Sequence, residues 1–218
     1  MVIHNTSKFT IQFGDANSKI SEEALFLKQI HSSDGVVVTS KAHAEKLKKN
    51  TIEGDFLITN QKNIPIGVKT ADCLPIVLYD PVQIVVAVIH AGWRGSMQKI
   101  LPKTITTMQK EFGTEPKLLN VFFGPSIQSC CYEVGKELLD VGKQFPFFHK
   151  VVHKRRGKTF FDLPGFNENV FFSSQAKLSS IIPCRRICTA CDSSYFSYRR
   201  DALESGRQQT VVFLKDFF

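Results

Sequence analysis

The sequence of 218 residues predicts a mixed α/β fold. Short runs of β-branched and apolar residues, bounded by turn residues, are typical of buried strands. Other stretches place apolar residues three or four positions apart, which is typical of helices. Strands interleaved with only a few helices favour a mixed α/β architecture. No internal repeat, Ser/Gly linker or low-complexity tract divides the chain, so we expect one domain over residues 1–218.

Six segments are predicted to be strands. Gly35–Thr39 is short and β-branched, and Pro75–Tyr79 stops at the turn signal Asp80-Pro81. Ile84–Ile89 is continuously apolar, as expected of a strand that is covered on both faces. The complete set is residues 35–39, 56–59, 75–79, 84–89, 118–123 and 210–214.

Two helices are predicted between these strands. Met97, Leu101, Ile105 and Met108 are spaced four, four and three apart, which places them on one helix face. Pro102 lies inside this run, so the helix either kinks or restarts there. The second helix covers residues 132–141, and the basic stretch 149–158 after it is predicted to be an exposed loop.

Composition excludes several classes of protein. An apolar fraction of 43% and 19 Phe residues exclude a disordered, solvating chain. The longest apolar run covers six residues, whereas a membrane-spanning helix needs about 20. The N-terminus lacks the basic start and apolar stretch of a signal peptide. We therefore expect a cytoplasmic protein without a membrane partner.

The chain carries a net charge of +8, from 28 Lys and Arg residues against 20 Asp and Glu residues. Basic clusters can bind nucleic acid, but no known nucleic-acid motif accompanies them, so solvated surfaces are the favoured interpretation. A non-enzymatic nucleic-acid binder is the third hypothesis for function. The clusters are Lys41, Lys46, Lys48 and Lys49, and Lys150, Lys154, Arg155, Arg156 and Lys158.

Three side chains lie at strand ends or in the adjoining turns, where a sheet presents functional groups to a cleft. His31 precedes a turn, Cys73 precedes a predicted strand, and His90 ends the long apolar strand. Two imidazoles and one thiolate suit Zn²⁺, and three protein ligands leave a position for water, as in catalytic sites. Zinc lowers the pKa of such a water and makes it a nucleophile.

The same residues allow a second chemistry. Cys73 could act as a covalent nucleophile with His90 as its base, and both chemistries need the thiolate. Asp72 is a candidate for proton transfer, but its side chain would point opposite to that of Cys73 in an extended segment. A structural role for Asp72 is therefore favoured.

Gly92-Trp93-Arg94-Gly95 is the strongest local signal. The glycines permit close approach of a ligand, the following helix N-terminus attracts anions, and Arg94 can contact a phosphate with two N–H groups. A tight turn with Trp93 in the core is the alternative. Gly124 opens a similar junction, and Tyr198 and Arg199 offer stacking on a purine and contact with a phosphate.

The six cysteines do not predict a structural metal site. Cys184, Cys188 and Cys191 contain only one CxxC pair, and the adjacent Cys130 and Cys131 are expected to point in different directions. Without an export signal, reduced thiols are the better expectation.

Taken together, the motifs resemble one family, the YfiH family, also called the multicopper polyphenol oxidase or laccase-domain family. The resemblance covers about residues 29–218. The motifs occur in the family's order: Gln29-Ile30-His31, Gly54-Asp55, Thr70 to Pro75, His90 to Gly95, Gly124 to Ile127 with Cys130 to Gly135, and Cys188-Thr189 through Tyr198 to Asp201 and Gly206-Arg207.

The resemblance implies a single-domain α/β/β/α sandwich with mixed sheets, similar to the catalytic domain of cytotoxic necrotizing factor. It implies that His31, Cys73 and His90 are catalytic zinc ligands. The chemistry of the residues described above makes Gly92, Arg94, Gly124, Tyr198 and Arg199 the candidates for binding substrate. The resemblance implies a purine nucleoside phosphorylase acting on adenosine, inosine, guanosine and methylthioadenosine with phosphate, which also deaminates adenosine. Older family names point to copper-dependent phenol oxidation and to peptidoglycan editing.

The sequence departs from the family pattern at two places, and its number of histidines bears on which metal it binds. Ser32 follows His31 where the family usually has Gly, and the region before Gln29 lacks an evident arginine-bearing match. A multicopper oxidase needs several copper ions with mainly histidine ligands, and this chain has six histidines in all. Zinc therefore suits the site better than copper. The sequence does not determine the oligomeric state.

Overall fold

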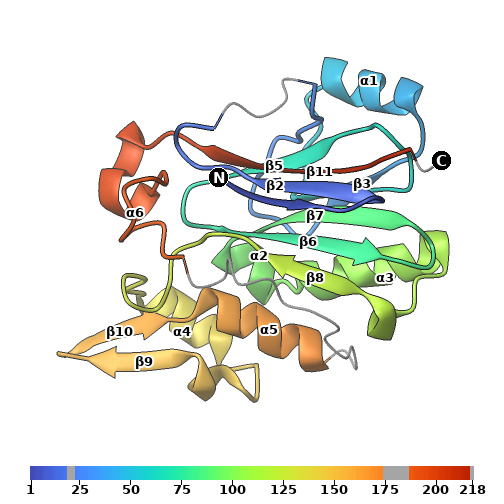
Figure 1. Cartoon of the computed structure of the whole chain (residues 1–218). Helices are drawn as coiled ribbons and strands as arrows, with labels where there is room; N and C mark the ends of the chain where they lie inside the picture. Colours follow the sequence, from blue (N-terminus) through green and yellow to red (C-terminus); the bar gives the residue numbers. More distant parts are fainter. Residues whose placement is uncertain (19–22, 174–186, 217–218) are drawn as a thin grey trace.

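The computed structural model describes residues 1–18, 23–173 and 187–216, and in it two β-sheets stack face to face (Figure 1). The larger sheet has the order β3-β4-β7-β6-β8, with β3 and β4 parallel and the other pairs antiparallel. Its strands are β3 (Gly35–Val38), β4 (Phe56–Thr59), β6 (Leu74–Asp80), β7 (Val85–Ala91) and β8 (Asn120–Phe123).

The smaller sheet is antiparallel and joins the two ends of the chain. Its order is β1-β2-β11-β5, so β2 near the N-terminus pairs with the C-terminal strand β11. The register places Val212 opposite Ile11 on one side and Ile66 on the other. The strands are β1 (Val2–Asn5), β2 (Phe9–Phe13), β5 (Ile66–Thr70) and β11 (Gln208–Leu214).

Side-chain alternation along β6 and β7 explains their continuous apolar sequence. Val77 and Val88 pack into the core between the two sheets, whereas Ile76 and Ile89 face the helices. Successive strand residues point to opposite faces, so a central strand covered on both sides must be apolar throughout. His90, next along β7, is therefore held by a rigid, fully buried element.

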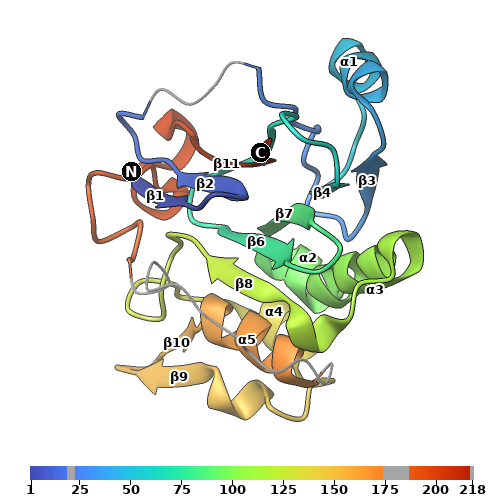
Figure 2. The same ribbon diagram turned by 45° about the vertical axis from the view of Figure 1, so that its right-hand side comes forward.

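Four helices pack on the side of the larger sheet that faces away from the smaller one, and in Figure 2 α4 and α5 lie below β8, with α2 and α3 to the right of β6 and β8. They are α2 (Trp93–Met97), α3 (Ile100–Phe112), α4 (Lys136–Gly142) and α5 (Leu163–Ser173). Leu101, Ile105 and Met108 are the buried face of α3, as predicted. The helix restarts at Ile100 after Lys99, which has φ of 62°, and Pro102 lies in its first turn, where no N–H bond is lost.

The remaining helices are short or peripheral. Helix α1 (Lys41–Lys49) contributes Ala44 and Leu47 to the core between the sheets and carries the first basic cluster on its outer surface. Helix α6 (Tyr198–Asp201) borders the site described below. Single 3-10 turns cover Pro116–Leu118, Phe148–Lys150 and Ala202–Glu204.

All six predicted strands are confirmed, with ends that differ by up to two residues. The helix predicted from residue 132 begins only at Lys136, because Glu133 and Val134 pair with the chain at Thr159 and Phe160 instead. The basic stretch 149–158 was wrongly predicted to be a loop. It is exposed, but it forms most of a hairpin of β9 (Val152–Arg155) and β10 (Lys158–Phe161).

The hairpin turn is explained by two residues. Arg156 and Gly157 have φ of 49° and 76°, and a two-residue turn with positive φ at both positions matches the twist of the paired strands. The described residues show two stacked sheets, the separate two-stranded hairpin and one helical layer on the larger sheet. The likeness to cytotoxic necrotizing factor stays a prediction. No helix among the described residues is long and apolar enough to cross a membrane, and the cytoplasmic location also stays a prediction.

Candidate functional site

His31, Cys73 and His90 lie side by side at one end of the larger sheet. Their ligand atoms all lie within 4.8 Å of one another, and the two imidazole centroids are 4.8 Å apart. Pairing of Leu74 with Ala91 brings the start of β6 beside the end of β7, which places Cys73 next to His90. His31 arrives from the turn before β3.

Asp55 holds both histidines. Its carboxylate, fully buried, lies 2.8 Å from His90 Nδ1 and accepts hydrogen bonds from the backbone N–H groups of Ile30, His31 and Ser32. Ser32 also donates its hydroxyl at 2.7 Å. Because Nδ1 of His90 is engaged, Nε2 is the nitrogen available to a ligand, an arrangement typical of metal-binding histidines.

The unusual backbone at His31 has the same origin. His31 has φ of 60°, in the left-handed region, and its own N–H and those of its two neighbours converge on the Asp55 carboxylate. The family's glycine after the first histidine is absent, and Ser32 contributes a hydroxyl to the same carboxylate instead.

Charge in the triad favours a thiolate. Burial raises the pKa of Cys73, but the charge of His90 and hydrogen bonds from His31 and His90 outweigh it and lower the pKa to about 6. Burial lowers the pKa of His90, yet the charges and hydrogen bonds of Cys73 and Asp55 raise it to about 9. Without a metal, these opposite shifts favour a thiolate beside an imidazolium. A divalent cation would replace the imidazolium proton.

Gly92 lets the chain pass close to the triad. A Cβ atom at this position would lie 2.8 Å from His31 Nδ1 and 3.1 Å from Cys73 Sγ. Gly92 precedes α2 with extended backbone that any residue can adopt, so the requirement for glycine is steric.

We expect Gly92→Ala to weaken metal binding by about 10- to 100-fold, as disturbance of ligand positions does. Competition with a zinc-binding dye measures this effect. Gly135→Ala is the matched control, because a Cβ there meets no atom within 4 Å. Equal affinity of Gly92→Ala and wild type would contradict the requirement for glycine.

The triad opens into a cavity of about 560 Å³, a volume suited to a small-molecule ligand. Four basic and three aromatic side chains line it: Lys69, Arg94, Arg199, Arg207, Trp93, Tyr132 and Tyr198. The walls therefore offer positive charge for an anion and flat faces for a planar ring.

The structure places most of the predicted substrate-binding residues at the cavity, but not all of them. Arg94, Tyr198 and Arg199 line the cavity, and Arg94 lies over the Trp93 ring at 4.4 Å while binding Glu137 at 3.1 Å. Gly92 adjoins the triad. Gly124 is not among the described residues that line the cavity. A Cβ atom at Gly124 would lie 2.4 Å from the Phe13 side chain and 2.7 Å from the Pro75 side chain, so this glycine permits close packing of the chain.

Asp72 differs from its predicted geometry. Its φ of 84° shows that the segment is not extended there, so its side chain need not point away from Cys73, and both residues line the cavity. The carboxylate accepts hydrogen bonds from the Thr189 hydroxyl at 2.7 Å and from the backbone N–H of Arg199 at 2.6 Å. These contacts agree with the structural role that was favoured for Asp72.

Several residues of the site were not singled out from the sequence. Asp55, Tyr132 and Arg207 belong to motifs of the resemblance, which was the available signal for them, but no role was assigned. Lys69 had no signal at all, because it reaches the cavity only through the pairing of β5 in the smaller sheet.

The family model described as "Multi-copper polyphenol oxidoreductase laccase" matches residues 2–215. The chain belongs to this family. The match begins well before Gln29, where the resemblance from motifs began. It includes β1 and β2, which contain none of those motifs but form part of the smaller sheet.

Several proteins that are similar to this chain are named as enzymes. A purine nucleoside phosphorylase of Clostridium acetobutylicum is 35% identical, covering 87% of this chain and 76% of that protein. Adenosine deaminase RL5 from an unknown prokaryotic organism is 33% identical, covering 89% and 76%. The crystal structure of the hypothetical protein YfiH of Bacillus licheniformis superimposes with a TM-score of 0.81 at 27% identity, covering 88% and 74%.

Proposed function

We propose that this chain is a zinc-dependent purine nucleoside phosphorylase that also deaminates adenosine. The observation that carries the proposal is the convergence of two imidazoles and one thiol on one cavity with cationic and aromatic walls. The names of the relatives support the same activities, and the proposed substrates are adenosine, inosine, guanosine and methylthioadenosine with phosphate.

The donor set fits zinc. His31, Cys73 and His90 would hold the ion, and Asp55 would keep His90 in the tautomer that presents Nε2. Bound zinc supplies Lewis acidity and lowers the pKa of water at an open position. Of the six histidines, all within the described residues, only His31 and His90 lie at this site. A cluster of several copper ions would need more imidazoles.

The chain's own residues would place the substrate. Trp93, Tyr132 and Tyr198 offer ring faces to a purine, and burial raises the pKa of Tyr132 above its ordinary range, so this phenol stays protonated and can donate a hydrogen bond. The guanidinium groups of Arg199 and Arg207 donate hydrogen bonds to backbone carbonyls, which carry no net charge. These bonds do not neutralise the positive charges, which can therefore attract a phosphate. Arg94 would give up its exposed ion pair with Glu137 and bind the phosphate instead.

The proposal is tested with zinc-loaded protein, adenosine and phosphate, followed by chromatography. Phosphorolysis breaks the glycosidic bond and yields adenine with ribose 1-phosphate, and only this product requires phosphate. Deamination yields inosine and ammonia with or without phosphate. If neither adenine, hypoxanthine nor inosine forms, the proposal is wrong.

The thiolate–imidazolium pair favours a second candidate, a metal-free Cys–His hydrolase of the peptidoglycan-editing type. Chelator and alkylating agent separate the two. Activity on an amide substrate that persists in chelator and disappears when Cys73 is alkylated would support the hydrolase. Copper-dependent uptake of oxygen with a phenol would instead support the polyphenol oxidase of the family description.

A further inference from the structure

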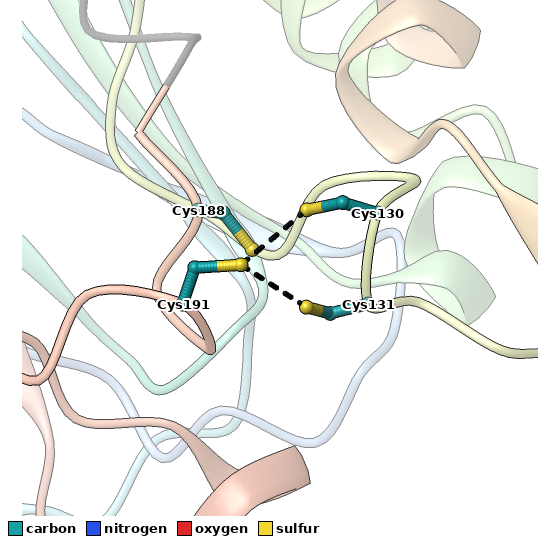
Figure 3. Close-up of side chains that lie close together, drawn as sticks. All are labelled: Cys130, Cys131, Cys188 and Cys191. Atoms are coloured by element: carbon teal, nitrogen blue, oxygen red, sulfur yellow. Dashed lines mark hydrogen bonds between the residues drawn. The ribbon is translucent and has the colours of Figure 1, made fainter.

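A second group of metal-ligand side chains lies apart from the triad. Cys130, Cys131, Cys188 and Cys191 point toward one another from two loops, as Figure 3 shows. All four sulfur atoms lie within 4.8 Å of one another, with Cys191 at 3.2 Å from Cys131 and 3.6 Å from Cys130. The triad does not share any of these residues.

This arrangement corrects the sequence prediction. The adjacent Cys130 and Cys131 were expected to point apart, as neighbours in a strand do, but residues 129–131 form a turn, in which that alternation does not apply. Both thiols therefore face Cys191. Cys184, the third cysteine of the predicted C-terminal group, lies outside the described residues.

We propose that these four cysteines bind a structural zinc ion. Zn–S bonds of about 2.3 Å at tetrahedral angles place thiolates about 3.8 Å apart, close to the separations seen here. The same separations are well beyond a disulfide bond of about 2.05 Å. Four protein ligands leave no open position, which is the arrangement of structural zinc.

The surroundings suit the negative charge of such a site. Burial raises the pKa of Cys188, but the nearby backbone N–H groups of Gln128, Cys191 and Ala190 outweigh it and lower the pKa. Burial and the neighbouring thiols raise the pKa values of Cys130 and of Cys131, the latter to about 11. Four thiolates cannot coexist without a cation, so binding would release the thiol protons to solvent.

Two guanidinium groups flank the cluster as well. Arg155 donates to the carbonyl of Cys130 at 3.2 Å, and Arg199 donates to the carbonyl of Cys131 at 3.2 Å. A zinc ion with four thiolates has a net charge of −2, and the two nearby guanidinium groups offset that charge.

The site would join two walls of the cavity. Tyr132 follows one cysteine pair directly, and Thr189 lies within the other and binds Asp72, whose carboxylate also accepts from the Arg199 N–H. The paired cysteines are about 60 positions apart in the chain, and a link over so many residues removes much freedom from the unfolded chain. Zinc here would fix the position of Tyr132 and Arg199.

Metal content of the full chain tests the site. Protein expressed with zinc and freed of loose metal by gel filtration is expected to hold two zinc ions per chain, and Cys73→Ser and Cys191→Ser one each. If the triad does not bind zinc, wild type and Cys73→Ser both hold one and Cys191→Ser holds none, so failure of the proposed function is recognisable. Equal content in Cys191→Ser and wild type, or a metal-free Cys73→Ser, would overturn the four-thiolate site.

A spectroscopic measurement covers the case in which Cys191→Ser does not fold. Cys73→Ser, which lacks the thiolate of the triad, is refilled with Co²⁺ and is expected to show thiolate-to-cobalt charge-transfer absorption and intense visible bands of a tetrahedral thiolate site. Absence of these bands would overturn the proposal. A mass of the unreduced protein that is lower by two hydrogens for each cysteine pair would indicate disulfides and would also overturn the proposal. Iron in place of zinc would overturn the identity of the metal.

Discussion

Cys73→Ser is expected to lower adenosine turnover by more than about 100-fold, because loss of a residue that only orients a ligand already costs 10- to 100-fold and Cys73 would be a ligand itself. The thiol lies within 4.8 Å of ligand atoms of both histidines, and its pKa of about 6 makes it a thiolate at neutral pH. Turnover and zinc content, measured on the same preparation, are expected to fall together.

Cys73→Asp separates the two roles that the thiol can have. A carboxylate can bind zinc but cannot replace a thiolate nucleophile in the same way. We expect Cys73→Asp to keep zinc and part of the activity. Full zinc content with no activity at all would show that a ligand at this position is not sufficient and would support Cys73 as the nucleophile.

Asp55→Ala is expected to lower the free energy of unfolding by about 3–5 kcal/mol, the effect of breaking a buried charged pair. The change leaves His90 without its partner and three backbone N–H groups of the His31 turn without their acceptor. Urea denaturation of the chelator-treated protein measures stability without a metal contribution. Zinc affinity is expected to fall by about 10- to 100-fold.

Asp34→Ala is the matched control for this change. Asp34 also forms an ion pair, with Lys103, but its side chain is 72% exposed, and exposed pairs contribute about 0–1 kcal/mol. If Asp55→Ala and Asp34→Ala destabilise the protein equally, Asp55 does not organise the site as described.

Local patterns predicted the central sheet well. The apolar run of β7 and the turn at Asp80 are local features, and they marked strands that the structure contains. The hairpin of β9 and β10 was missed because most of β9 is polar and exposed, and because only Phe161 at the end of β10 is fully buried. These residues therefore show no alternation of apolar and polar side chains that would indicate a strand. Strands β1 and β2 were not predicted, although Phe9, Ile11 and Phe13 alternate with polar residues in β2. Their place in the sheet depends on the pairing of β2 with β11 at the other end of the chain.

For the site, the sequence by itself determined which residue types stand at the strand ends, and the ordered motifs determined the family. Only the tertiary structure decided that Asp55 orients both histidines, that Lys69 reaches the cavity, and that four cysteines meet in space. The physical reason is that these contacts join residues distant in the chain, and their distances depend on strand register and turn geometry, which no local spacing records.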